Sequence, residues 1–182
     1  AERLRRARPT RICWVDSRSG ARVPAVEIGG RTITLHSRYD PSAEAERIAA
    51  AAQQTTICLG LGGGLHVPAL AAAARSVVIV EWDAGLARAV LQQSDLSGVL
   101  ERPGVSLLVA PPAAELADHL AERYRAAIDP PPVIVSLRSR EAADRHGAER
   151  AREVVRQATE LLKDDVAAQA RFGRAWVRNA LA

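Results

Sequence analysis

The chain has 182 residues, of which 48% are apolar, 25% are charged and only 3% are aromatic. This length suits one ordinary domain, with or without a helical extension, and the apolar fraction is too high for a disordered chain. We find no internal repeat. The two cysteines, Cys13 and Cys58, lie in separate apolar runs without the spacing of a disulfide scaffold or a zinc site. The composition therefore excludes repeat proteins, disulfide-rich folds and disordered chains.

The net charge is +4, and the basic residues are almost all arginines, because Lys163 is the only lysine. The arginines alternate with Glu and Asp along the expected helices instead of gathering on one face, so we expect no nucleic acid partner. No window reaches the roughly 18–20 apolar residues of a membrane span, and the charged start does not resemble a signal peptide. We therefore expect a cytoplasmic protein with no membrane partner.

Residues 1–40 predict a small antiparallel hairpin or meander. The segments 11–15, 26–28 and 31–36 are rich in β-branched residues, and glycine-containing turns separate them. This region is expected to precede the main domain as a separate β unit.

A short polar stretch leads from this β unit into the first long helix. Asp40 precedes Pro41, which suits a helix N-cap followed by the first helical residue, so we expect a helix over residues 41–53. Asp40 is expected only to cap this helix. Arg38 and Tyr39 are candidates to lean over a neighbouring cleft.

Residues 41–140 predict a Rossmann-like domain. Short β-branched runs alternate with helix-length segments, the former at 55–59, 77–80, 105–109 and 133–137, the latter at 65–75, 84–93 and 113–127. Such alternation is typical of a parallel sheet that is covered by helices on both faces and joined by right-handed crossovers. The expected fold class is α/β, a Rossmann-like (methyltransferase-like) parallel sheet with an N-terminal β-hairpin and a C-terminal helical pair.

Residues 141–182 predict two amphipathic helices, 141–162 and 165–181, with a break and a cap at Asp164 and Asp165. Three interpretations are open: the helices pack on the sheet, lead into a following domain, or contact a partner. Simple cover for one face of the sheet explains them equally well. The chain has no methionine and ends inside the second expected helix. We therefore expect a piece of a longer protein, with a downstream domain of the same chain as its partner and a homo-oligomer as a further candidate.

The segment Leu59-Gly-Leu-Gly-Gly-Gly-Leu65 lies between the first parallel strand and its helix, where backbone N–H groups converge. Its G-x-G-x-G spacing matches S-adenosylmethionine-dependent methyltransferases better than the dinucleotide fingerprint. An acidic residue 21 positions after the first glycine suits ribose hydroxyls, and the tryptophan beside it suits a base. A nucleotide, a nucleotide sugar and S-adenosylmethionine are the candidate ligands. The predicted cofactor-binding residues are Gly60, Leu61, Gly62, Gly63, Gly64, Glu81 and Trp82.

A purely structural interpretation accounts for the same residues. The glycines then make only a tight turn, Glu81 caps the next helix, and Trp82 fills a gap between layers. The methyltransferase interpretation also meets departures from its usual pattern. Cys58 stands where an acidic residue is usual, and Ala110-Pro111-Pro112 follows the third strand in place of an acid or an amide.

No residue is assigned a catalytic or metal-binding role. The four histidines, at 36, 66, 119 and 146, are scattered, with no carboxylate or cysteine at ligand spacing. His66 is expected on the surface of its helix, where it is more often solvated than bound to a ligand. Cys58 is expected to behave as a small apolar group in a buried strand.

Four stretches of the chain resemble those of a known family, in the same order: Leu35-His-Ser-Arg-Tyr-Asp-Pro-Ser-Ala-Glu-Ala-Glu-Arg47, Leu59-Gly-Leu-Gly-Gly-Gly-Leu-His66, Val80-Glu-Trp-Asp-Ala84 and Trp176-Val-Arg-Asn179. Together they resemble the amino-terminal region of the motility-associated factor proteins. These are bacterial flagellin glycosyltransferase-like proteins, whose central domain is related to archaeal 6-hydroxymethylpterin diphosphokinase. The most specific element is Ser37-Arg-Tyr-Asp-Pro41 followed by Glu-Ala.

The resemblance implies a Rossmann-like accessory domain that precedes the domain thought to bind the nucleotide sugar, with the tail motif leading into it. The fragment would not be catalytic alone, and flagellin would be a partner only through the parent protein. His66 replaces the aromatic residue that is usual near the end of the glycine turn. Two alternatives stay open: an S-adenosylmethionine-dependent methyltransferase-like domain, and a non-catalytic interaction module assembled through its terminal helices.

Overall fold

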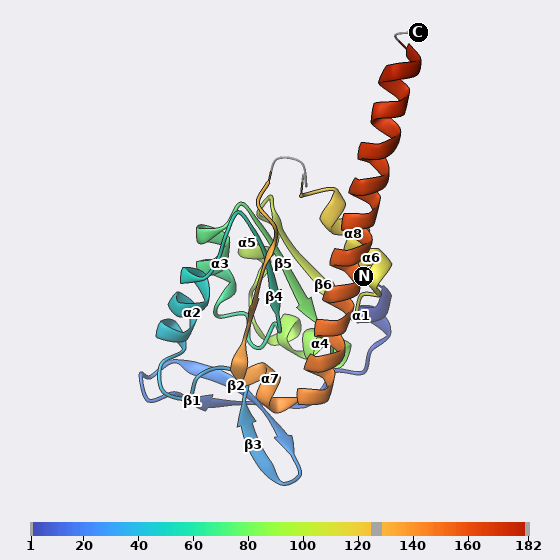
Figure 1. Cartoon of the computed structure of the whole chain (residues 1–182). Helices are drawn as coiled ribbons and strands as arrows, with labels where there is room; N and C mark the ends of the chain where they lie inside the picture. The colour runs from blue at the N-terminus through green and yellow to red at the C-terminus, as the bar shows by residue number, and fades with distance from the viewer. Residues whose placement is uncertain (1, 125–128, 181–182) are drawn as a thin grey trace.

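The computed structural model describes residues 2–124 and 129–180, with side chains described as far as Asp164 in the last helix. Figure 1 labels most of its elements. In chain order they are α1 (Glu2–Arg6), β1 (Ile12–Asp16), β2 (Arg22–Ile28), β3 (Arg31–Thr34), α2 (Pro41–Ala50), β4 (Thr55–Leu59), α3 (Val67–Ala73), β5 (Ser76–Glu81), α4 (Ala84–Gln93), α5 (Ser97–Leu100), β6 (Val105–Val109), α6 (Ala113–Ala121), β7 (Val133–Ser136), α7 (Arg138–Ala143) and α8 (Arg145–Ala180).

In the described part of the chain, four strands form a parallel sheet in the order β6-β5-β4-β7. Numbered along the chain, this order is 3-2-1-4, which is the first half of a doubly wound Rossmann sheet. The strand order reverses between β4 and β7, so the switch point of the fold lies there. The predicted α/β, Rossmann-like class is confirmed.

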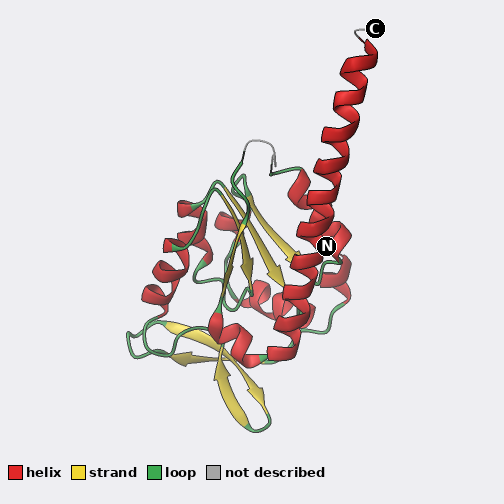
Figure 2. Cartoon of the chain, in the orientation of Figure 1, coloured by secondary structure: helices red, strands yellow, loops and turns green. Residues whose placement is uncertain are grey.

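The sheet lies between two layers of helices (Figure 2). One face carries α2 to α5, and its core includes Leu70, Leu86 and Val90. The other face carries α6 and α8, which contribute Leu116 and Val155 to a second core. β4 and β5 are buried along their whole length because both of their faces are covered.

The antiparallel strands β1, β2 and β3 form a meander at the carboxyl end of the parallel sheet (Figure 1). The predicted meander is confirmed, although β2 begins at Arg22, four positions earlier than expected. The extra residues pass through Pro24, a residue type that is normally found at strand edges or bulges. Val23 and Ala25 are fully buried on either side of it, so packing against the sheet domain holds this part of the strand.

The helix expected after the meander begins at Pro41 and is capped as predicted. Asp40 accepts hydrogen bonds from the N–H groups of Ser42 and Ala43, both at 2.9 Å. The short helices α1 and α5 were not expected. Residues 125–127 of the helix predicted over 113–127 lie outside the described residues.

The C-terminal region contains α7 and the long helix α8, which runs along the sheet and extends beyond it (Figure 1). The predicted break at Asp164 and Asp165 is wrong, because α8 continues through both residues. The chain breaks instead at Asp144, whose Oδ1 accepts the N–H of Gly147 at 2.8 Å and whose Oδ2 accepts Trp82 Nε1 at 2.8 Å. An acidic residue ends or starts a helix only where it finds such partners. Among the described residues, no helix is both long and apolar enough to cross a membrane.

Replacing Asp144 tests this helix start. Asp144→Ala removes the acceptors for both Gly147 and Trp82, so we expect the free energy of unfolding to fall by about 1–2 kcal/mol. Urea unfolding followed by tryptophan fluorescence measures the change. Asp144→Asn keeps one oxygen for the Gly147 N–H and should lose less. Equal stability of the alanine variant and the native chain would contradict the capping role.

Candidate functional site

The glycine turn between β4 and α3 is closed. Gly60 to Gly64 are all buried. Gly60 has a φ of +94°, and a Cβ there would lie 2.8 Å from Cγ of Arg140. A residue with a side chain at this position would therefore be strained and would collide with Arg140. Because residue 60 is a glycine, the side chain of Arg140 can occupy the space where a cofactor was expected.

The other glycines of the turn are covered by the chain itself. A Cβ at Gly62 would collide with Leu137, one at Gly63 would lie 2.6 Å from Pro24, and one at Gly64 would lie 2.6 Å from Leu96. These neighbours come from distant segments: Pro24 from β2, Leu96 from the connection before α5, and Leu137 from the end of β7. The meander and the β7–α7 connection together cover the carboxyl end of the sheet.

Backbone N–H groups that would face a phosphate already have partners. The N–H of Leu61 donates to Oε2 of Glu81 at 2.9 Å, and the N–H of Gly63 donates to Nε2 of His36 at 2.9 Å. The N–H of Gly64 donates to the carbonyl of Leu61 at 2.8 Å. Two side chains and one backbone carbonyl of this domain thus supply the acceptors that a bound anion would otherwise supply.

Glu81, the residue predicted to hold a ribose, forms a buried ion pair with Arg140. Arg140 Nη2 donates to Oε1 at 2.8 Å and Nε to Oε2 at 3.3 Å, which is a bidentate arrangement. The side chains are 3% exposed for Arg140 and fully buried for Glu81. The carboxylate also accepts the N–H groups of Leu61 and Asp83. Four donors therefore surround Glu81, and all of them belong to the chain.

The ring of Trp82 packs against the guanidinium group of Arg140. The Arg140 guanidinium lies 4.2 Å from the ring centroid, which is cation–π geometry. The indole Nε1 donates to Asp144. Trp82 therefore joins β5 to the start of α8, in the place where base stacking was expected.

The structure thus brings the predicted cofactor residues together, with the polar groups of Leu61, Gly63, Glu81 and Trp82 bonded within the chain. That they bind a cofactor stays a prediction. A cavity of about 340 Å³ has Arg140 in its lining, and none of the five turn residues lines it. The sequence analysis missed Arg140, since it is 59 residues from Glu81 and no local pattern connects the two.

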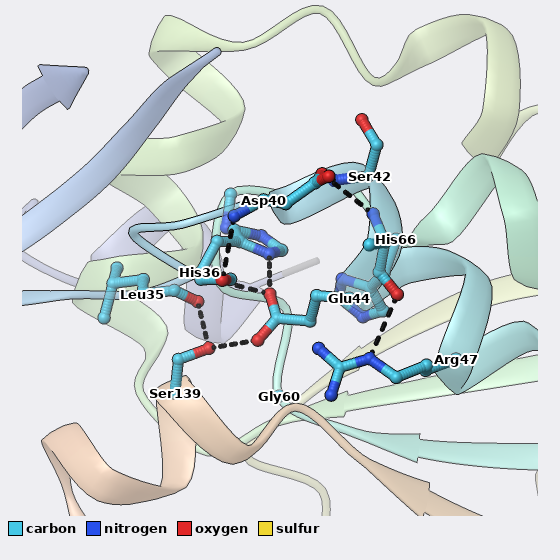
Figure 3. A network of polar contacts seen from close by, with 12 residues as sticks. Leu35, His36, Asp40, Ser42, Glu44, Arg47, Gly60, His66 and Ser139 are labelled. Atoms are coloured by element: carbon cyan, nitrogen blue, oxygen red, sulfur yellow. Dashed lines mark hydrogen bonds and ion pairs between the residues drawn. The ribbon is translucent and has the colours of Figure 1, made fainter. Parts of the chain in front are cut away.

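A polar network links the turn to the Ser37-Arg-Tyr-Asp-Pro41 stretch (Figure 3). Oε2 of Glu44 accepts His36 Nδ1 at 3.1 Å and the N–H of Ser37 at 2.9 Å, and Oε1 accepts the hydroxyl of Ser139 at 3.0 Å. Burial alone raises the pKa of Glu44, but these hydrogen bonds outweigh it and leave the pKa below its ordinary value. Glu44 therefore stays ionised.

His36 is a neutral acceptor in this network. A backbone N–H can only donate, so Nε2 of His36, which accepts from Gly63, carries no proton and Nδ1 carries it toward Glu44. The lone pair that a general base would use is therefore already occupied. The sequence analysis missed this histidine–carboxylate pair because its members are eight residues apart on different elements.

His66 is fully buried, so its expected position on a helix surface is wrong. Its Nε2 lies 3.3 Å from Sγ of Cys58, and its ring centroid lies 5.4 Å from that of His36. Burial and the neighbouring His36 lower the pKa of His66 to about 3. Cys58 is fully buried, as expected, and burial and the charges of Glu81 and Glu141 raise the pKa of its thiol.

The exposed part of the Ser37-Arg-Tyr-Asp-Pro41 stretch lies away from the glycine turn. Tyr39 is 64% exposed, and the Arg18 guanidinium lies 4.5 Å from its ring centroid. The N–H of Arg18 donates to the carbonyl of Arg38 at 2.8 Å. Arg38 and Tyr39 thus lie beside the β1–β2 turn instead of leaning over the glycine turn. Among the side chains described, those of residues 2–124 and 129–164, no three from His, Cys, Asp or Glu are grouped to hold a metal ion.

The fold and the closed turn define a Rossmann-like α/β domain whose ligand crevice is filled by its own side chains. The chain matches no model of a known protein family, and no curated protein matches it. Function must therefore be argued from the residues themselves.

Removing one partner of the buried ion pair should be costly. Arg140→Ala leaves Glu81 charged and buried, so we expect the free energy of unfolding to fall by about 3–5 kcal/mol. Arg138→Ala, an exposed neighbour in the same helix, should stay within about 0.5 kcal/mol of the native chain. The double variant Glu81→Leu with Arg140→Leu should recover only part of the loss, because the N–H groups of Leu61 and Asp83 then lose their acceptor. A similar, small loss in both arginine variants, measured by urea unfolding, would contradict the role of the pair.

The buried His66 should make stability depend on pH. Its pKa is lowered from 6.5 to about 3, so its contribution is complete above pH 6.5 and is lost as the pH falls from 6.5 toward 3. We expect a slope of up to about 1.4 kcal/mol per pH unit for this one proton. His66→Phe should flatten the profile between pH 6.5 and about 5, where carboxylates contribute least. The exposed histidine His146 provides the matched control as His146→Gln, which should leave the slope unchanged. An unchanged slope in His66→Phe would refute the assignment.

Proposed function

We propose that this chain is a non-catalytic accessory domain, a Rossmann-like module of a protein similar to the motility-associated factors. The observation that carries the proposal is the bidentate pair of Arg140 and Glu81 over the glycine turn. In a nucleotide-binding Rossmann domain the corresponding carboxylate and the turn N–H groups bind the ribose and the phosphates. Here the chain uses both for its own packing.

Ligand entry would have to break this arrangement. A nucleotide would need to displace the Arg140 guanidinium from Glu81 and from Trp82, and to replace His36 as acceptor for the Gly63 N–H. Each displaced group would have to find a new partner or remain buried without one, which is unfavourable. The closed geometry therefore supports a scaffold role more than nucleotide binding.

The motif that carries the family resemblance also has a structural role. Ser37 and Asp40 shape the entry to α2, and Glu44 joins α2 to His36 and Ser139. Ser37, Asp40 and Glu44 are not arranged as a nucleophile with a general base. In this proposal sugar transfer belongs to a downstream domain of the same chain, and flagellin is met only through the parent protein.

Calorimetry tests the proposal directly. We expect no binding heat when the chain is titrated with a nucleotide sugar such as UDP-N-acetylglucosamine or with S-adenosylhomocysteine, because the crevice is filled. Binding of either ligand that disappears in Glu81→Gln would overturn the scaffold role. Binding of S-adenosylhomocysteine alone would favour the methyltransferase-like alternative. Arg31→Gln serves as the control variant, since Arg31 is exposed on β3, away from Glu81 and the glycine turn.

A further inference from the structure

One hollow beside the edge strand β7 stays open. In open α/β sheets, ligands bind outside the carboxyl ends of the strands where the strand order reverses, which here is between β4 and β7. Leu137 and Arg140 fill the part over the glycine turn. A cavity of about 310 Å³ remains between α2 and β7, and the last residue of β7, Ser136, lines it. This volume is at the lower end of the range for small-molecule sites.

The cavity has a positive balance of charge. Arg47 from α2 and Arg138 from α7 line it together with Glu44. The Glu44 oxygens already accept three hydrogen bonds from other groups. Both arginines are exposed, and within the described residues neither forms an ion pair; only Nε of Arg47 is bonded, to the carbonyl of Ala43. In Figure 3 the Arg47 guanidinium points from α2 toward the segment that carries Ser139.

Backbone donors at the sheet edge add to this positive character. The N–H of Leu137 points inward and donates to the carbonyl of Leu59 on β4 at 3.0 Å. Successive residues of a strand alternate in direction, so the N–H of Ser136 points away from β4, toward the open edge. Because β7 is the edge strand, no neighbouring strand of the described sheet takes up this donor.

An apolar wall completes the cavity. Ile48 and Ala51 contribute from α2, and Ile134 and Val135 from β7. A purely charged ligand would leave this wall uncovered, whereas a ligand with an apolar body would bury it.

We propose that this groove binds a small organic anion, namely a carboxylate or a phosphate ester on a compact body. Its oxyanion lies between Arg47 and Arg138, with the N–H of Ser136 as a further donor, and its body covers Ile48 and Ala51 at the end of α2. Guanidinium groups suit such oxyanions because their planar donors match two oxygens at once. This site is separate from the filled crevice, so it goes beyond the scaffold role proposed above.

Nuclear magnetic resonance of the ¹⁵N-labelled chain tests the site with defined probes. Butyrate presents the carboxylate and glycerol 3-phosphate the phosphate ester, while butyramide and glycerol are their uncharged counterparts. We expect at least one of the two anions to shift the amide signals of Ser136 and Arg138 in a saturable way, with little response to the neutral compounds. Which anion saturates identifies the preferred oxyanion.

Paired variants decide the result. The double variant Arg47→Gln with Arg138→Gln should raise the dissociation constant by about tenfold or more. Arg31 is an exposed arginine on β3, and Arg31→Gln should leave the constant unchanged. The proposal fails if neither anion gives a saturable shift up to about 50 mM, a concentration at which affinity is negligible. It also fails if the neutral compounds give equal shifts, or if the double variant binds the anion as tightly as the native chain does. Shifts at Leu61 and Gly63 would instead report nucleotide-type binding in the crevice, so the two proposals fail separately.

Discussion

The buried pair of Arg140 and Glu81 is the interaction on which the rest of this structure depends. It closes the glycine turn, fastens α7 to the end of β5, and holds the guanidinium against Trp82, which in turn bonds the residue that starts α8. A buried ion pair seldom adds much net stability, because both charges lose their water. Its effect here is on specificity, since alternative arrangements of α7 would leave a carboxylate buried without a partner.

A second set of contacts extends the same logic to the amino-terminal half. Nε2 of His36 accepts the N–H of Gly63 in the glycine turn, and Nδ1 donates to Glu44. The hydroxyl of Ser139 also donates to Glu44. Ser139 and Arg140 are consecutive, so one turn of α7 is tied both to α2 and to β5. The carboxyl end of the sheet, where Rossmann domains usually bind ligands, is therefore the place where the meander, α2 and α7 are joined.

Much of the fold follows from local patterns, and the departures have physical causes. The strands at 55–59 and 105–109 and the helix at 84–93 begin and end where periodicity places them, because each is bounded by turn or capping residues. The long α8 passes through Asp164 and Asp165 because local capping signals act only where a loop is available. The candidate site was half predictable: the spacing placed Glu81 beside the glycine turn, where it accepts the N–H of Leu61.

The sequence by itself determined the alternation of strands and helices, the sharp turn at Gly60 and the acidic residue at the end of β5, because these depend on periodicity, on allowed backbone angles and on short spacing. Only the tertiary structure decided what occupies the turn. Arg140 is 59 residues from Glu81, and His36 is 27 residues from Gly63. Their meeting depends on the crossover topology and on the need of buried charges and N–H groups for partners, and neither is visible in a local pattern.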